Sequence, residues 1–251
     1  MQKSKTILVT GATSGVGLAL AKKLLKLGHT VWATGRKKEL LEELQRLGAK
    51  TVRADLVHPT EMDNLVQSID DVLDVVIFSA GVGTFTYAKE VSDREVEQTM
   101  IVNVIRPIQL TKRFLPMFHP KKGGQFIFIG SQAGKVATPK TSVYAASKHA
   151  LIGYTNALRM ELTVDNIVVT TIHPGPIDTP FLEHADHTGQ YRHAVKKQLL
   201  SIDKVVDATI QTIGTTKREV NLPGYMGLTS KLYAVIPTMI ERLGKRFFYK
   251  K

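Results

Sequence analysis

The chain has 251 residues, 43% of them apolar, and it contains no cysteine. A disulfide-stapled secreted module needs cysteines, and a disordered chain has far fewer apolar side chains, so both classes are excluded. The 34 Lys and Arg exceed the 22 Asp and Glu, and the formal net charge of +12 raises the question of nucleic-acid binding. No aromatic-rich basic stripe or helix-turn-helix pattern accompanies this charge, so we expect no nucleic-acid partner.

We expect one domain over residues 1–251, because α/β folds often reach this length around a single core. The longest apolar runs, such as residues 232–240 with Pro237 inside, are shorter than the roughly 18 residues that a membrane-spanning helix needs. The amino-terminal sequence enters a strand pattern without the apolar region of a signal peptide, which favours a cytoplasmic protein.

Short apolar runs alternate with amphipathic segments along the first two hundred residues. In chain order, the runs at 5–10, 30–34, 51–53, 74–79, 125–130 and 167–173 predict strands, and the segments at 16–27, 37–47, 59–69, 92–105 and 142–162 predict helices. Nearly all-apolar strands separated by helices are typical of a parallel sheet covered on both faces. We therefore predict a doubly wound α/β fold of the Rossmann type, with its ligand site beyond the carboxyl ends of the strands.

The first strand runs into the sequence TGATSGVG, residues 10–17, which opens the first helix. Glycines at such a junction permit a tight turn and a close backbone approach to a pyrophosphate at the helix amino terminus. A nucleoside-triphosphate P-loop would need Gly-Lys-Ser/Thr here, and Val16, Gly17 and Leu18 exclude it. The segment predicts a dinucleotide site.

The end of the second strand selects between dinucleotides, because an acid there binds a ribose diol whereas a basic residue accepts a 2′-phosphate. The sequence is Thr34-Gly35-Arg36-Lys37-Lys38, without a carboxylate. The planar guanidinium of Arg36 can bind a phosphate, so we predict NADP as the cofactor. The alternative is that Arg36 and its neighbours form a solvated helix start.

With this turn in place, the chain resembles the classical short-chain dehydrogenase/reductase family over residues 5 to about 180. Position 79 departs from the family, since Ser79-Ala80-Gly81 stands where Asn-Ala-Gly is usual. The residues that match the family's catalytic set are Asn103, Ser131, Tyr144 and Lys148. The resemblance implies a cofactor site formed by Gly11, Thr13, Ser14, Gly15, Val16, Gly17, Arg36, Asp55, Ala80, Gly81, Tyr144, Lys148, Pro174, Gly175, Ile177 and Thr179.

The chemistry of the matched residues suits hydride transfer. Tyr144 and Lys148 stand four positions apart on a predicted helix and so share a face, where an ammonium is expected to lower the pKa of the phenol from about 10 toward working pH. Tyr144 could then exchange a proton with a carbonyl or alcohol oxygen, which Ser131 would hydrogen-bond. The resemblance further implies that Lys148 holds the nicotinamide ribose and that Asn103 anchors a water.

We therefore predict an NADP(H)-dependent oxidoreductase that interconverts a carbonyl and an alcohol of a small-molecule substrate. A nucleotide-binding redox sensor or scaffold is the alternative, but it would be expected to lack one of Ser131, Tyr144 or Lys148, and all are present. A protein resembling this family is expected to form a homodimer or homotetramer through the helices at 92–105 and 142–162.

Two further segments carry expectations. Residues 181–200 are predicted to cover the substrate as a flap, with Phe181, Leu182 and Tyr191 as an apolar wall and with polar contacts from His184, Asp186 and His187 as the alternative. No metal is expected, because the acidic and histidine residues of this segment lack zinc spacing.

The tail, residues 228–251, is basic and apolar. It is predicted to form a helix over 232–248 that is broken at Pro237 and packs on protein near the substrate opening or at a subunit interface, with peripheral membrane contact as the less favoured alternative.

Overall fold

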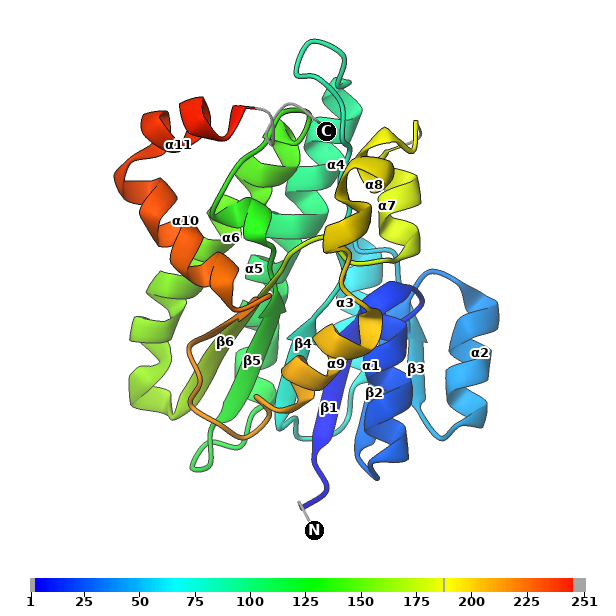
Figure 1. Cartoon of the computed structure of the whole chain (residues 1–251). Coiled ribbons are helices and arrows are strands. Elements are labelled where there is room, and N and C mark those ends of the chain that lie inside the picture. The colour runs from blue at the N-terminus through cyan, green and yellow to red at the C-terminus, as the bar shows by residue number, and fades with distance from the viewer. Residues whose placement is uncertain (1–2, 187, 246–251) are drawn as a thin grey trace.

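The computed structural model describes residues 3–186 and 188–245 of the chain. One parallel sheet has the strand order β3-β2-β1-β4-β5-β6-β7, with helices on both faces (Figure 1). The strands are β1 (Thr6–Thr10), β2 (Thr30–Gly35), β3 (Lys50–Arg53), β4 (Val75–Phe78), β5 (Gly124–Ile129), β6 (Ile167–Pro174) and β7 (Glu219–Leu222). The predicted doubly wound α/β fold is confirmed.

Helices connect and follow the strands. They are α1 (Gly15–Lys26), α2 (Lys38–Arg46), α3 (Pro59–Ser68), α4 (Asp93–Met100), α5 (Arg106–Phe114), α6 (Ser142–Glu161), α7 (Pro180–Ala185), α8 (Gln190–Val195), α9 (Ile202–Ile210), α10 (Tyr225–Val235) and α11 (Pro237–Leu243). No helix in the described part of the chain is long and apolar enough to cross a membrane.

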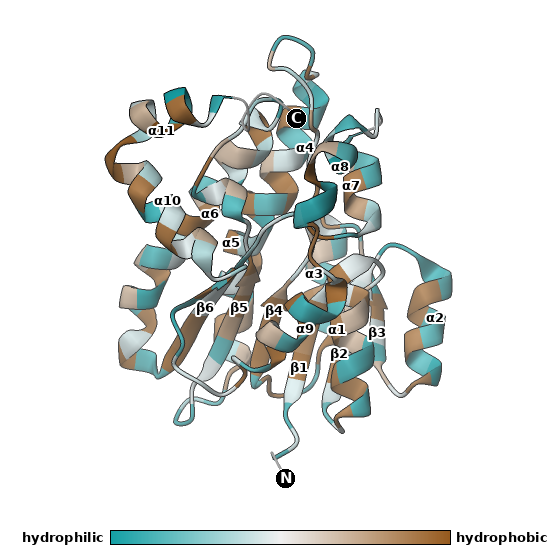
Figure 2. Ribbon diagram, viewed as in Figure 1, coloured by the Kyte–Doolittle hydropathy of each residue, from teal (hydrophilic) through white to brown (hydrophobic). Residues whose placement is uncertain are grey.

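Successive strand residues enter opposite layers of the core, as the alternation of a pleated strand requires. Leu8 packs in the layer that contains residues of α3, α5 and α6, whereas its neighbours Ile7 and Val9 pack with residues of α1, α2 and α9. Both faces of the sheet are therefore covered, which explains why the strands are apolar without alternation. Figure 2 shows hydrophobic residues along the central strands of the sheet.

The helix expected at 92–105 does not end there. After α4 the chain makes a wide π-helical turn over Ile101–Ile105 and continues as α5 to Phe114. Pro107 lies in the first turn of α5, where the missing N–H is tolerated. Pro107 therefore lies within one continuous helical path.

The carboxy-terminal part differs from the sequence expectation in its extent. Sequence reasoning did not identify α9 or β7, and the tail helix begins at Tyr225 rather than at residue 232. The predicted break at Pro237 is confirmed, since α10 ends at Val235 and α11 begins at the proline. The expected end of that helix, at 246–248, falls outside the described residues.

Candidate active site

The carboxyl ends of the central strands open into a cavity of about 640 Å³. Nearly every residue predicted for the site lies in its wall. These residues are Gly11, Thr13, Ser14, Gly15, Val16, Gly17, Arg36, Asp55, Ala80, Gly81, Ser131, Tyr144, Lys148, Pro174, Gly175, Ile177 and Thr179. Asn103 is the exception, because it is buried behind this wall.

The turn between β1 and α1 accepts only glycine at two positions. Gly11 has a positive φ of 67°, and a Cβ there would lie 2.7 Å from the Cα of Ala80. A Cβ on Gly17 would lie 2.3 Å from the carbonyl oxygen of Gly11. The Ser14 side chain makes no capping hydrogen bond, so the first N–H groups of α1 face the cavity as donors for an anion.

The end of β2 brings a cation to the same edge of the cavity. Thr13 Oγ1 accepts a hydrogen bond of 3.2 Å from the Arg36 backbone N–H, and a side chain at Gly35 would collide with Thr13. The Arg36 side chain is 59% exposed, and its guanidinium lies 3.8 Å from the Asp55 carboxylate. Because an exposed pair of this kind is weak, the guanidinium can turn to an incoming phosphate.

Ser79, which stands where the family usually has asparagine, lies in a turn whose backbone is held by hydrogen bonds. Thr10 Oγ1 accepts from the backbone N–H groups of Ser79 and Ala80, at 3.2 and 3.3 Å. The Ser79 hydroxyl lies beside Gly17, on the floor of the glycine-rich turn. The serine thus faces the dinucleotide end of the cavity, and the turn after β4 is held by Thr10.

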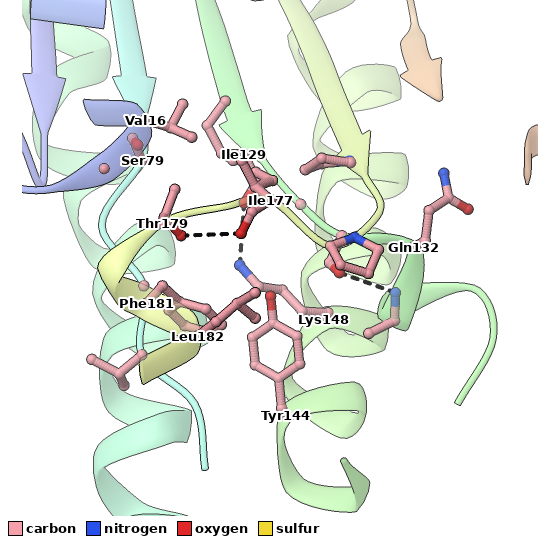
Figure 3. Close-up of a pocket in the computed structure, with 18 of the residues that line it drawn as sticks. Val16, Ser79, Ile129, Gln132, Tyr144, Lys148, Ile177, Thr179, Phe181 and Leu182 are labelled. Carbon is pink, nitrogen blue, oxygen red and sulfur yellow. Dashed lines mark hydrogen bonds between the residues drawn. The ribbon is translucent and has the colours of Figure 1, made fainter. Parts of the chain in front are cut away.

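Three predicted catalytic side chains line the cavity, and Figure 3 shows two of them, Tyr144 and Lys148, close together in its wall. Tyr144 and Lys148 project from one face of α6, and the Lys148 Nζ lies 5.7 Å from the centre of the Tyr144 ring. That ammonium donates a hydrogen bond of 3.1 Å to the Ile129 carbonyl. Ser131 follows β5, accepts 3.0 Å from the Ala133 N–H, and also hydrogen-bonds Tyr144 through its side chain.

Burial governs the protonation of this pair. It raises the pKa of Tyr144 to about 12, an effect that the hydrogen bond with Ser131 only partly opposes. It lowers the pKa of Lys148 to about 8. The expectation that the ammonium lowers the pKa of Tyr144 is therefore wrong for this site, because desolvation dominates. Tyr144 is a protonated phenol at neutral pH, the state that a proton donor requires.

Asn103 lies in the π-helical turn and shapes the wall from behind. Its Nδ2 donates to the Val82 carbonyl at 2.8 Å and to the Ser147 hydroxyl at 3.0 Å, and its Oδ1 accepts from the Val82 N–H at 2.9 Å. This two-way contact fixes the segment after Gly81. Turns of the π type inside helices occur frequently at functional sites.

A polar network that sequence reasoning missed braces the Ser131 turn. Gln132 Nε2 donates to the His173 carbonyl at 2.8 Å and to Asn221 Oδ1 at 3.0 Å. Lys135 Nζ lies 3.0 Å from both carboxylate oxygens of Glu219. The network joins the ends of β5, β6 and β7. The sequence did not predict it, because two of its members, Glu219 and Asn221, lie in the unpredicted strand β7.

His173 is buried within this network. Burial lowers its pKa to about 4, with the nearby Lys135 ammonium as the second cause, although Glu219 acts in the opposite direction. The imidazole is therefore neutral at pH 7, and its Nε2 lies 3.6 Å from a Glu219 oxygen.

The outer half of the cavity is aromatic. Phe85 lies 5.5 Å from Tyr144 and 4.5 Å from Tyr191 between ring centres, and Phe181 lies 5.5 Å from Tyr144. The expected apolar wall of Phe181, Leu182 and Tyr191 is confirmed. Phe85 was missed, because its position follows no strand directly.

Two polar residues of the expected flap, His184 and Asp186, are not part of the described cavity wall. His184 is exposed and outside the cavity wall. Asp186 accepts from the Tyr191 N–H at 2.6 Å and from Thr188, so its carboxylate holds the connection between α7 and α8. His187 lies outside the described residues.

The tail completes the mouth of the cavity. Its contributing residues are Tyr225, Met226, Thr229, Tyr233, Ile240 and Gly244. The charged side chains in the described wall are Arg36, Asp55 and Lys148, and all three lie at the dinucleotide end or at the catalytic centre. The part of the described wall that the aromatic residues and the tail form is thus uncharged.

A family model described as short chain dehydrogenase matches residues 5–190. Among curated proteins, the "Uncharacterized oxidoreductase YbbO" of Escherichia coli strain K12 is 36% identical over 192 residues, which cover 75% of this chain and 71% of that protein.

Solved structures agree with this match. The closed form of serine dehydrogenase complexed with NADP+ has a TM-score of 0.78 at 26% identity, covering 86% of this chain and 94% of that one. A 4-hydroxyisoleucine dehydrogenase complexed with NADH has a TM-score of 0.78 at 27% identity, covering 87% and 97%. The chain belongs to the short-chain dehydrogenase family and is an oxidoreductase of that family.

Proposed function

We propose that this protein is an NADP(H)-dependent enzyme that interconverts a carbonyl and an alcohol by hydride transfer, with Tyr144 as the proton donor and acceptor. The observation that carries the proposal is the meeting of Ser131, Tyr144 and Lys148 in a cavity whose other end is a glycine-only turn. A nicotinamide nucleotide, when bound, supplies the hydride.

The cavity residues fit that nucleotide. The N–H groups at the start of α1 would hold the pyrophosphate, and Arg36 would hold the 2′-phosphate beside Asp55. Lys148 would bind the nicotinamide ribose, and the backbone near Ile177 together with the Thr179 hydroxyl would meet the carboxamide. The positions of these residues in one wall support the assignment.

In the direction of reduction, the Tyr144 phenol donates its proton to the carbonyl oxygen as charge develops there. Ser131 hydrogen-bonds the same oxygen, and the Lys148 ammonium stabilises the phenolate left behind. Asn103 fixes the backbone at Val82 and, as predicted from the resemblance, anchors a water that returns the proton. In oxidation the same groups act in reverse.

The competing function, a redox sensor or scaffold that binds the nucleotide without turnover, gains no support from the geometry, since none of the three central side chains is turned away from the cavity. A homodimer or homotetramer through the helices at 92–105 and 142–162, and a cytoplasmic location, stay predictions. The exposed Ile105 and Ile108, at and just after the end of the first of these segments, support the oligomer.

The decisive assay measures NADPH oxidation with a panel of aldehydes, ketones and 3-oxoacyl thioesters. We expect turnover of at least one carbonyl by the wild-type protein and its loss in Tyr144→Phe. If NADPH binds and no carbonyl of the panel is reduced, the sensor function is favoured instead.

A further inference from the structure

Helices α10 and α11 stand at the outer edge of the molecule, beyond the carboxyl end of β6 (Figure 1). Their exposed residues include large apolar side chains, and the exposed fractions of five of these lie between 52% and 79%. These five, the outer tail face, are Leu228, Leu232, Val235, Met239 and Leu243. Their spacing of three or four residues places them on one side of each helix. Single exposed apolar residues are ordinary, but a contiguous stripe of them marks a contact surface.

The opposite side of the same helices belongs to the cavity. Met226, Tyr233 and Ile240 line its mouth. The Tyr233 hydroxyl donates 2.7 Å to the Glu241 carboxylate, which ties α10 to α11 across the break at Pro237. Whatever covers the outer tail face therefore lies next to the opening of the cavity.

Cations flank the outer tail face. In the described tail the basic residues are Lys231, Arg242 and Lys245, and the acid is Glu241, whose carboxylate is bound by Tyr233. The sequence adds Arg246, Lys250 and Lys251 beyond them. The surface thus combines apolar side chains with a positive edge, which complements an anionic partner.

Three occupants were expected for this face, and the structure separates them. The described part of the chain's own domain does not cover the outer tail face, because its five residues remain 52–79% exposed. A second copy paired about a two-fold axis would bring this face to itself and place its cations opposite cations. An anionic lipid surface can bury the apolar side chains of the outer tail face and also attract the cations beside them.

We propose that α10 and α11 dock this protein on anionic membrane surfaces through the outer tail face, so that the cavity mouth opens at the lipid boundary. The inner side of the tail lies at the cavity mouth, where the sequence leads us to expect it, and the proposal assigns the outer side to the membrane. The substrate class follows from the same placement and rests on the proposed function. With an uncharged aromatic wall and a mouth at the bilayer, the cavity takes a lipophilic aldehyde or ketone without a carboxylate.

The docking test uses the full chain and vesicles of phosphatidylglycerol and phosphatidylcholine in equal amounts, with pure phosphatidylcholine as comparison. We expect co-sedimentation with the anionic vesicles. Replacing Lys231, Arg242 and Lys245 by Gln should lower the partition coefficient by about 100-fold at moderate salt. The matched control replaces the exposed Lys121, Lys122 and Lys217, at the other end of the sheet, and should leave partition nearly unchanged.

A second variant, with Leu228, Leu232 and Val235 replaced by Gln, should also lose vesicle binding. None of these residues lines the cavity, so NADPH oxidation with a short soluble aldehyde should persist in both tail variants. Wild-type protein that stays in solution with anionic vesicles overturns the docking proposal. The proposal is also overturned if the wild-type protein is an oligomer that does not bind vesicles and the variant with Leu228, Leu232 and Val235 replaced is a smaller species. In that case a second copy of the chain occupies the outer tail face.

The substrate class is tested with a homologous series of straight-chain aldehydes. We expect kcat/KM to rise about threefold per added methylene until the cavity is full, and 2-oxo acids of equal length to be poor substrates. A preference for the acids would overturn the substrate class while leaving hydride transfer intact. Absence of turnover on every carbonyl would instead count against the proposed function, and vesicle binding would still be measurable.

Discussion

The Lys148 ammonium lies 5.7 Å from the centre of the Tyr144 ring, and both side chains are buried in the same wall. Burial opposes charge on each of them, raising the pKa of the phenol to about 12 and lowering that of the amine to about 8. The pair therefore differs in how it responds to pH: Lys148 loses its charge in the mildly alkaline range, whereas Tyr144 keeps its proton there.

Tyr144→Phe should remove the proton donor and keep the ring contacts with Phe85 and Phe181. We expect turnover to fall by about 100-fold or more while the NADPH dissociation constant stays within about twofold. Steady-state kinetics and fluorescence titration check this. Near-wild-type turnover on a good substrate would refute the assignment of Tyr144.

The pH profile of carbonyl reduction follows from Lys148. Because its pKa is lowered to about 8, its positive charge is present below that pH and lost above it. We expect kcat/KM for reduction to be level near pH 6–7 and to fall as pH rises through about 8. Lys148→Ala should abolish this fall of kcat/KM with pH, and it should weaken NADPH binding as well. A profile that stays level to pH 10 contradicts the account.

Arg36→Ala tests the cofactor preference. A charge-assisted fork to the 2′-phosphate contributes roughly 1.5–3 kcal/mol, so NADPH should bind one to two decades more weakly and NADH nearly as before. Lys38→Ala, an exposed cation of α2 outside the cavity wall, is the matched control and should change neither constant. Equal dissociation constants for the two nucleotides in the wild type would exclude NADP specificity.

His173 should make the fold acid-sensitive. Its pKa is about 4 in the folded protein against a usual value of 6.5, so between these values the unfolded chain binds a proton that the folded chain does not. The part of the free energy of unfolding that depends on His173 is therefore fully present above about pH 6.5. It is lost as pH falls toward 4, and this loss amounts to about 3 kcal/mol.

The comparison of wild type with His173→Gln isolates that contribution. Urea unfolding at several pH values should show the difference between the two proteins narrowing as pH falls from 7 to 4. A difference that stays constant over this range would mean that His173 titrates normally in the fold.

The sequence was informative wherever a strict local requirement coincided with a strand end. Gly11 and Gly17 are fixed by collisions that any side chain would make, and Tyr144 and Lys148 by one helical turn. The edge strand β7 escaped detection because EVNL has mixed polarity and its residues are only half-buried. Because β7 was not predicted, the network of Gln132, Lys135 and Glu219 was not predicted either.

Other features depend on contacts between distant segments. Phe85 and Tyr191 stand more than a hundred positions apart in the chain, yet their ring centres lie 4.5 Å apart, which no local pattern indicates. The pKa of Tyr144 depends on how completely the surrounding side chains exclude water, so the charge of Lys148 alone gave the wrong direction. The tail's two faces became distinguishable only when its helices were placed against the cavity mouth.

The central claim is hydride transfer to a carbonyl with Tyr144 donating the proton, and one isotope experiment tests it most directly. Wild-type protein and Tyr144→Phe are incubated with NADPH carrying deuterium at the transferable position and a long-chain aldehyde, and the alcohol is analysed by mass spectrometry. The account predicts one deuterium on the former carbonyl carbon in the wild-type product and almost no alcohol from the variant. Alcohol without deuterium, or equal yields from both proteins, would contradict it.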